Sequence, residues 1–431
     1  MNAVSGQPAP ARSHGRLWEN IASLSALQVL NYAVPLATVP YLVRVMGPAQ
    51  FGLLSFAQAI VLYFNLVTDY GFSLSATRAV ASRRDDPEEL ADTFWRTMFA
   101  KVAVLLVSGA ALTALVFVVP RLRQTPLLYA AAFLNVAGTV ACPVWFFQGI
   151  EEMRVLTIAH SAARLLTIPA LMLFVRSPED TVRAAAIQGA VPLLASLLLV
   201  PALRRRVPGG PRLLLCAEIP AVLREGWHLF IAHTSLAIHS ATTAVVLGLV
   251  AGNTQVGYYS AADKVIRAAT SATGPVAQAL YPHLNSLKTQ SMELTLDLMR
   301  RSFGWILLLA AAASLATFLL AAPLGLLLWG PAFGPSIAIL RCLSPLPFLL
   351  ASVNIIGTQT MLLFEMDRVL TRTVVWCALI NIPLTAVLSL FLGALGAAVA
   401  IVLVAVVMVL SLAWSLRRRR LAIWRAAFRR A

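Results

Sequence analysis

Three charged residues stand close together in an otherwise apolar segment of the second half of the chain. Asp263, Lys264 and Arg267 are three and four positions apart, so a helix would carry them on neighbouring positions of one side. Lysine and arginine on a shared surface suit an anion, and phosphate above all, because a guanidinium group pairs with two phosphate oxygens. The segment predicts an anion-binding surface, with Asp263 either an ion-coupling residue or the ion-pair partner of Arg267.

Further charges fall inside apolar segments elsewhere, and a charge that faces lipid costs about 3 kcal/mol on insertion scales. We expect the substrate-binding set to be Arg44, Arg78, Arg164, Lys264, Arg267 and Arg341. Some of these, and also Lys101 and Arg372, lie near predicted helix ends, where a long side chain can instead extend to the lipid headgroups. Asp69 is the deepest acid of the first half. It is either a coupling site for a proton or a sodium ion, or a partner of Arg78.

The composition predicts the surroundings of these charges. Of 431 residues, 59% are hydrophobic and 12% are charged, and the mean hydropathy is +0.80. A soluble domain has about twice that charged fraction. The apolar residues form blocks, such as 102–120, 302–329 and 395–416, of roughly the 18 to 25 residues that cross a bilayer core of about 30 Å. We therefore predict an all-α integral membrane protein.

About twelve transmembrane helices fit the sequence, in two six-helix bundles. We expect a tail at 1–17, a bundle at 18–203, a linker at 204–226, a second bundle at 227–416 and a basic tail at 417–431. The predicted helices are 18–43, 51–76, 97–119, 127–147, 155–175, 183–203, 227–250, 256–282, 302–329, 336–363, 372–391 and 395–416.

The net charge of +16 orients this chain in the membrane and does not indicate a nucleic-acid partner. Most of the 34 Lys and Arg fall in the tails and in the loops on one side. The opposite loops hold five, namely Arg44, Arg121, Arg123, Arg176 and Arg183. By the positive-inside rule we expect both termini to be cytoplasmic, in a multi-pass protein of the inner membrane. The run Arg417 to Arg420 is expected to touch anionic membrane lipids.

A short internal repeat supports two halves. Residues 45–57 (VMGPAQFGLLSFA) and 250–262 (VAGNTQVGYYSAA) align without a gap and share six of thirteen residues, including Gly47 with Gly252 and Gly52 with Gly257. Six predicted helices separate the copies, so the halves have the same orientation in the membrane. They should be related by a pseudo-two-fold axis along the membrane normal, as in many transporters.

The acidic stretch and the cysteines have structural interpretations, and the sequence contains no enzyme motif. The acidic stretch 85–89, with Pro87, is typical of a helix start, because acids favour the positive end of the helix dipole. The four cysteines (Cys142, Cys216, Cys342 and Cys377) show neither metal spacing nor a pairing pattern. The sequence has no glycine loop, metal cluster or nucleophile motif of an enzyme, so we expect no catalytic residue, no metal site and no cofactor.

The segment 20–78 resembles the start of bacterial O-antigen and polysaccharide flippases. These form the polysaccharide-transport branch of the multidrug/oligosaccharidyl-lipid/polysaccharide exporter superfamily. The similar pieces are Asn31–Tyr32, Pro35–Leu36, Pro40–Tyr41–Leu42, Arg44, Gly47, Phe51–Gly52, Tyr70–Gly71–Phe72 and Ser75–Ala76–Thr77–Arg78, with weaker ones at Gly257–Tyr258–Tyr259, Ala262–Asp263–Lys264, Gly330–Pro331–Ala332–Phe333, Ser336 and Leu340–Arg341.

The resemblance implies two bundles that face each other across a cationic cavity. It also implies a substrate, a lipid-linked oligosaccharide on an undecaprenyl pyrophosphate carrier, moved outward by alternating access with H⁺ or Na⁺ coupling. Partners would be this substrate, membrane lipids and a polymerase of polysaccharide assembly. A multidrug/cation antiporter of the same superfamily is the first alternative, but it favours acids in its cavity. A membrane-embedded polymerase or ligase, which favours a long outer loop, is the second, and a scaffold role is the third.

Overall fold

The computed structural model describes residues 12–207, 242–271, 292–361, 363–364 and 366–418. Every regular element in these ranges is helical, and nine of their helices are long and apolar enough to cross a membrane. The predicted all-α membrane architecture is thereby confirmed. The ends of both predicted tails, most of the linker and parts of the helices predicted at 227–250 and 256–282 lie outside the described residues.

The N-terminal bundle comprises α1 to α9 and the C-terminal bundle the helices from residue 242 onward. The first contains α1 (Arg12–Asp69), α2 (Phe72–Ser82), α3 (Pro87–Val118), α4 (Pro120–Arg123), α5 (Pro126–Ala141), α6 (Val144–Gly149), α7 (Met153–Phe174), η1 (Pro178–Asp180), α8 (Thr181–Gly189) and α9 (Val191–Arg206). The second contains the helix Thr242–Ala251, α11 (Asn253–Ser271), α13 (Met292–Leu319), α14 (Ala321–Trp329), η2 (Pro331–Phe333), α15 (Gly334–Leu343), α16 (Leu346–Val353), η3 (Asn354–Met361), α17 (Asp367–Leu392) and α18 (Ala394–Arg418).

A break at Gly47 divides α1 into two arms. Gly47 has φ 67° and ψ 175°, and Pro48 follows it at the start of the second arm. A residue with a side chain rarely adopts this positive φ, and the ring of Pro48 disfavours a helical residue before it. The first arm and the second arm therefore correspond to the helices predicted at 18–43 and 51–76. Gly252 repeats the feature before α11, with φ 94°.

The start of α3 confirms the interpretation of the acidic stretch. The carboxylate of Asp86 accepts hydrogen bonds from the backbone N–H groups of Glu88 (2.9 Å) and Glu89 (3.2 Å), and Pro87 occupies the first helical position. This start lies ten residues before the predicted one. Since an α-helix rises 1.5 Å per residue, α3 is about 48 Å long and exceeds a bilayer core of about 30 Å.

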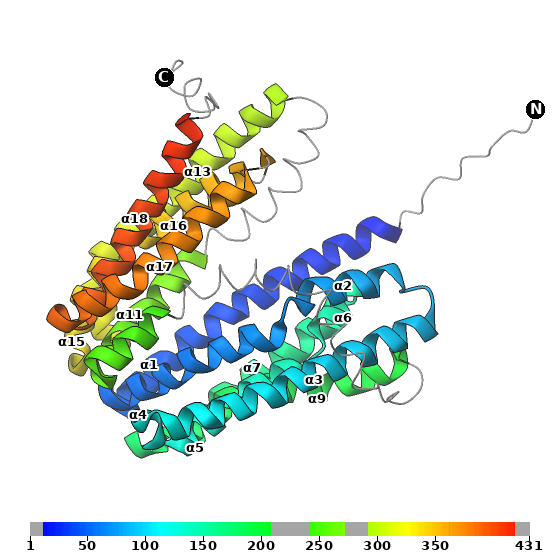
Figure 1. Ribbon diagram of the computed structural model, residues 1–431, viewed down its shortest axis with the longest axis horizontal. Coiled ribbons are helices and arrows are strands. Elements are labelled where there is room, and N and C mark those ends of the chain that lie inside the picture. The colour runs from blue at the N-terminus through cyan, green and yellow to red at the C-terminus, as the bar shows by residue number, and fades with distance from the viewer. Residues whose placement is uncertain (1–11, 208–241, 272–291, 362, 365, 419–431) are drawn as a thin grey trace, which may run out of the picture.

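The two bundles meet at one end and diverge toward the end where the chain termini lie (Figure 1). We call these the junction end and the terminal end. The break at Gly47 and the start of α11 lie at the junction end, where the second arm of α1 packs against α11. A hydrophobic core crosses the junction, in which the ring of Phe333 stands edge-on to Phe51 (6.2 Å between centroids) and to Tyr258 (5.8 Å).

The repeated glycines form the centre of this junction. A Cβ built on Gly52 would overlap the backbone carbonyl of Asn253, and a Cβ on Gly257 would overlap that of Pro48. In the repeat Gly52 is equivalent to Gly257, and Pro48 to Asn253. The contact is thus reciprocal, as a two-fold relation requires, and it gives the sequence repeat a structural cause.

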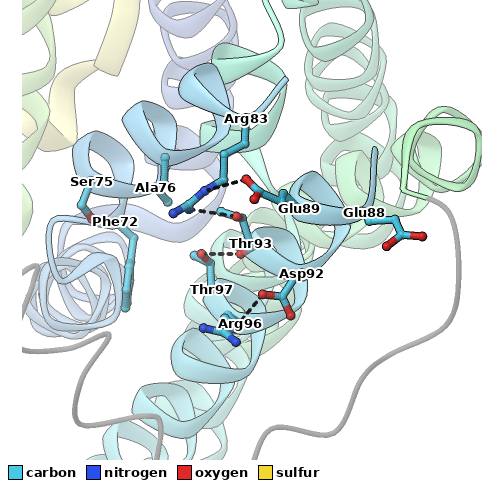
Figure 2. Close-up of a pocket in the computed structure, with 11 residues that line it drawn as sticks. Phe72, Ser75, Ala76, Arg83, Glu88, Glu89, Asp92, Thr93, Arg96 and Thr97 are labelled. Atoms are coloured by element: carbon cyan, nitrogen blue, oxygen red, sulfur yellow. Dashed lines mark hydrogen bonds and ion pairs between the residues drawn. The ribbon is translucent and has the colours of Figure 1, made fainter. Parts of the chain in front are cut away.

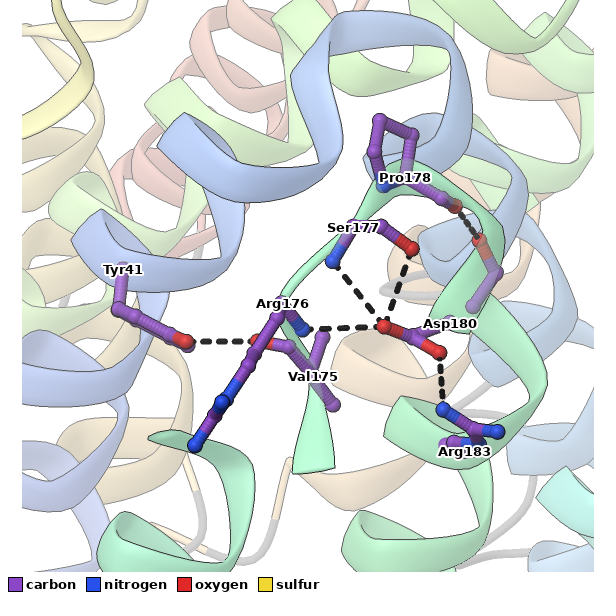
Figure 3. A network of polar contacts seen from close by, with 8 residues as sticks. Tyr41, Val175, Arg176, Ser177, Pro178, Asp180 and Arg183 are labelled. Atoms are coloured by element: carbon purple, nitrogen blue, oxygen red, sulfur yellow. Dashed lines mark hydrogen bonds and ion pairs between the residues drawn. The ribbon is translucent and has the colours of Figure 1, made fainter. Parts of the chain in front are cut away.

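Turns at the same end are held by polar groups. Asp180 accepts hydrogen bonds from the N–H groups of Arg176 and Ser177 (both 3.0 Å) and forms an ion pair with Arg183 at 2.6 Å, while the Tyr41 hydroxyl donates to the Val175 carbonyl at 2.6 Å (Figure 3). These bonds fix the turn from α7 to α8 against the first arm of α1.

Candidate functional site

Two arginines at the junction end span the two bundles. The guanidinium of Arg121, on α4, donates to the side-chain oxygen of Asn253 at 2.8 Å and to the Leu249 carbonyl at 3.4 Å, and it stands over the Phe56 ring. Arg44 donates to the carbonyl of Leu327, on α14. Arg44 was expected among the substrate-binding residues; in this conformation its guanidinium closes the junction.

Nearer the middle of the second arm of α1, a hydrogen bond joins the hydroxyls of Tyr63 and Thr242 at 2.8 Å. Tyr63 lies eleven residues beyond Gly52, a rise of about 16 Å along the helix. The polar contact between the bundles therefore extends from the junction end to about half the depth of a bilayer core.

The charged residues of α11 lie beyond the junction contact. Lys264 follows Gly257 by seven residues, two helical turns, so it lies on the side of α11 that faces the second arm of α1. Arg267 and Asp263 form an ion pair of 2.5 Å, and the Arg267 side chain is 51% exposed. The structure therefore places a cation, Lys264, beyond the junction, with the ion-paired Arg267 one turn further along α11.

The remaining predicted cations are spread over both bundles. Arg164, on α7, is partly buried, and its Nε atom has no hydrogen-bond partner in the described part of the chain. Arg341, on α15, and Arg78, on α2, are exposed. These residues come from separate helices, and the structure does not bring all six predicted cations together.

Asp69 lies at the end of α1, where it accepts a hydrogen bond from the Ser73 hydroxyl at 2.9 Å. No ion pair joins it to Arg78 in the described structure, so the predicted partner is not engaged. Lys101, on α3, is instead the cation within electrostatic range of Asp69. Lys101 is only 5% exposed, which contradicts the interpretation that its side chain extends to the headgroups.

A polar group that sequence reasoning missed lies inside the C-terminal bundle. Asn381, on α17, donates to Thr243 and accepts from Thr385, both at 3.3 Å, and all three side chains are fully buried. Thr243 is the neighbour of Thr242, which contacts the other bundle. Asn and Thr at a spacing of four on one predicted helix were the available signal.

A separate cavity of about 410 Å³ lies at the terminal end between α2 and α3. Figure 2 shows its charged lining, in which Arg83 pairs with Glu89 at 3.5 Å and Arg96 with Asp92 at 2.8 Å. The charges of these pairs balance internally. The residues that the structure describes contain no group of three or more His, Cys, Asp or Glu placed to hold a metal ion.

Comparison with known proteins decides the class. A family model described as "Polysaccharide biosynthesis protein" matches residues 17–288. The chain belongs to this family. It is 30% identical to a putative O-antigen transporter of Escherichia coli K12 over 89% of this chain and 92% of that protein. It is thus a multi-pass membrane transporter and not an enzyme, as predicted.

Solved structures confirm the fold. The lipid II flippase MurJ in an inward closed conformation matches with a TM-score of 0.72 and 12% identity, over 94% of this chain and 90% of that one. An inward-facing multidrug transporter of the MATE family matches with a TM-score of 0.68 and 16% identity, over 91% and 96%. The chain therefore has the two-bundle fold of these transporters.

Proposed function

We propose that the protein moves an undecaprenyl-pyrophosphate-linked oligosaccharide, the repeat unit of an O-antigen, capsule or exopolysaccharide, across the inner membrane by alternating access. The observation that carries this proposal is the position of Lys264 and Arg267 on α11, directly beyond the junction. A pyrophosphate between the bundles would meet these cations on α11. Arg164 and Arg341 add positive charge from other helices, while the lipid tail stays in the bilayer.

The charges also favour this substrate over the cation of a multidrug antiporter. The predicted site contains six cations against two acids, Asp69 and Asp263, and Asp263 is already neutralised by Arg267. A cationic drug would be repelled by the Lys264 ammonium on α11. Coupling to H⁺ or Na⁺ through the two acids is part of the same proposal, as is an association with a polymerase.

Deletion of the gene tests the proposal. We expect lipid-linked repeat units to accumulate on the cytoplasmic leaflet and finished polymer to disappear, while repeat-unit synthesis continues. Analysis of extracted lipids and of surface polysaccharide measures both. If synthesis of the repeat unit itself stopped, the protein would belong to an earlier step.

Reporter fusions test the orientation. We expect fusions after Arg84, Arg206 and the C-terminus to report cytoplasm, and fusions near Arg123, Asn253 and Pro331 to report periplasm, because positive loops stay inside. In that orientation the junction end faces the periplasm and the terminal end the cytoplasm. A periplasmic C-terminus would reverse the direction of the proposed opening.

A further inference from the structure

A cluster of ionisable groups lies inside the N-terminal bundle and forms none of the contacts described above between the two bundles. Lys101 comes from α3, Asp69 from the end of α1, Cys142 from the end of α5 and His160 from α7. Asp69 and Cys142 are within electrostatic range of Lys101, and the Cys142 sulfur lies 3.2 Å from Nε2 of His160. Four helices thus bring titratable groups near one another.

The Lys101 amine is unusual because it is nearly inaccessible and yet is not directly neutralised. Lys101 is 5% exposed. No ion pair within the described structure joins it to Asp69, whose carboxylate accepts a hydrogen bond from the Ser73 hydroxyl. A lysine that only held helices together would form a direct ion pair, because an uncompensated buried ammonium is costly. A buried amine that gains and loses a proton avoids this cost for part of a cycle.

The other groups around Lys101 favour a proton over a metal cation. Cys142 and His160 offer sulfur and nitrogen, whereas Na⁺ is a hard cation that takes oxygen ligands. The ammonium form of Lys101 would repel any metal ion at Asp69. Arg164, four residues after His160 on α7, adds a further positive charge on that side, and Arg78 of α2 is exposed away from the cluster's buried centre.

The second arm of α1 connects the cluster to the contact between the bundles. This arm carries Gly52 at the junction, Tyr63 and Asp69. The Tyr63 hydroxyl forms a hydrogen bond with Thr242 of the C-terminal bundle. Asn65, one turn before Asp69, bonds Asn135 of α5 at 2.9 Å. A change of charge beside Asp69 therefore acts on the helix that forms the inter-bundle contact.

We propose that Lys101 is the proton-binding residue that couples transport to a pH gradient, with Asp69 as its counter-charge. Nζ accepts one proton to form an ammonium ion beside the carboxylate, and it returns that proton when the bundles change their arrangement. This inference rests on the proposed transport function and assigns its coupling ion. It makes Lys101, rather than Asp69 alone, the group whose charge changes.

The first test observes the amine directly. The chain has three lysines, Lys101, Lys264 and Lys288, so a Lys264→Arg/Lys288→Arg protein with isotope-labelled lysine gives a single Nζ signal by NMR in detergent. We expect the signal to pass from the ammonium to the amine position within the pH range over which the protein stays folded. A signal that keeps the ammonium position throughout would overturn the proposal.

The second test uses proteoliposomes and undecaprenyl pyrophosphate bearing a fluorescent sugar as the probe. A gradient of about two pH units offers a driving factor of about one hundred for one proton. We expect the wild type to accelerate by at least about tenfold under this gradient. Lys101→Met, Lys101→Arg and Asp69→Asn should move the probe downhill without acceleration. Arg96→Met, an exposed cation on the same helix, is the matched control and should accelerate normally.

The outcomes separate the two proposals. A wild type that does not move the probe at all contradicts the transport function. Probe movement with full acceleration in both Lys101→Met and Lys101→Arg contradicts the proton site and leaves the transport function standing. If both substitutions prevent membrane insertion, the NMR titration, which keeps Lys101, decides alone.

Discussion

The two copies of the internal repeat are alike where they touch and differ where they leave the junction. Up to Gly52 and Gly257 both copies have a glycine with positive φ (Gly47 and Gly252) and take part in the reciprocal backbone contact. Both also have a glutamine whose side-chain oxygen accepts a hydrogen bond from the first residue of another helix. Gln50 accepts from Thr181 of α8 at 3.1 Å and Gln255 from the N–H of Ala394 of α18 at 2.9 Å.

Beyond that point the copies have different chemistry. Asp263, Lys264 and Arg267 on α11 correspond to Gln58, Ala59 and Leu62 on α1. Gln58 bonds Gln188 at 2.8 Å inside its own bundle, whereas α11 carries an ion pair and a second cation. The shared part builds the junction that both bundles need. The divergent part gives α11 two cations and an acid where the equivalent positions of α1 are uncharged.

The largest effect is expected from breaking the shared part. Gly52→Ala and Gly257→Ala each place a Cβ against a backbone carbonyl that has no freedom to turn away. Overpacking of this kind costs about 1 to 3 kcal/mol, which would separate the bundles at the junction end. We expect surface polymer to fall at least about tenfold in cells that carry either variant as their only copy.

Gly304→Ala is the control for both glycine variants. It lies within α13, and nothing approaches its built Cβ within 4 Å. Alanine there should stabilise the helix by about 0.5 to 1 kcal/mol and leave transport unchanged. Equal losses in all three variants would mean that glycine in the helices, and not the junction contact, is what matters.

Substitution of Arg267 sharpens the contrast between the divergent parts. If Arg267 binds the substrate phosphate, as proposed, Arg267→Ala removes a charge-assisted bond worth about 1.5 to 3 kcal/mol. Arg267→Lys retains the charge but loses the planar fork, and Arg267→Glu opposes the substrate. We expect transport of the lipid probe in the order Lys, then Ala, then Glu, at equal amounts of protein in the membrane.

Arg301 offers a matched control for Arg267. It forms the same kind of ion pair, with Asp297 four residues earlier at 3.1 Å, but on an exposed surface. Arg301→Ala should leave transport intact, since exposed pairs contribute little. If Arg267→Ala behaved like Arg301→Ala, the ion pair with Asp263 would have no role in substrate binding. If Arg267→Ala instead lowered the amount of protein in the membrane, and the charge-swapped Asp263→Arg/Arg267→Asp variant restored it, the ion pair would be structural.

The periodic features of the sequence predicted the fold well. Apolar block length, the midpoint linker and the repeat led to two six-helix bundles, because a membrane helix must satisfy its own backbone and must match the bilayer thickness. Local rules also predicted the Asp86 helix start and the Asp263–Arg267 pair, which depend only on neighbouring residues. The extension of α3 was missed, because residues 87–96 are polar and hydropathy alone ends a helix there.

Contacts between distant helices could not be predicted in this way. Asp69 and Lys101 stand 32 positions apart in the sequence, and Arg78, only nine positions away, was considered as the partner of Asp69 instead. Arg44 and Arg121 were counted as charges of an outer loop, whereas their partners lie in the opposite bundle. Helix rotation decides whether a cation faces a partner, lipid or the other bundle. The helices are apolar on several sides around these cations, so the sequence does not determine that rotation.

The smallest effect is expected from loosening the junction without breaking it. Arg121→Ala removes bonds to Asn253 and Leu249 that together stabilise the closed junction by about 0.5 to 1.5 kcal/mol, since each replaces a bond to water. A two-state equilibrium would then shift about two- to tenfold toward separation at this end. The variant should still transport, because the glycine contact remains and the bundles can still close.

A single cysteine at Ser55, which is buried beside the junction, would report this shift in a protein whose four native cysteines are replaced by alanine. We expect a membrane-impermeant maleimide to label it about two- to tenfold faster in Arg121→Ala than in the parent, in line with the lost bonds. Arg123→Ala is the control: Arg123 is exposed on the same short helix, and no hydrogen bond of its side chain is found among the described residues. Faster labelling in both variants would mean that the lost positive charge of α4, and not the lost hydrogen bonds of Arg121, opens the junction. Unchanged labelling in Arg121→Ala would mean that the two repeated glycines hold the junction without it.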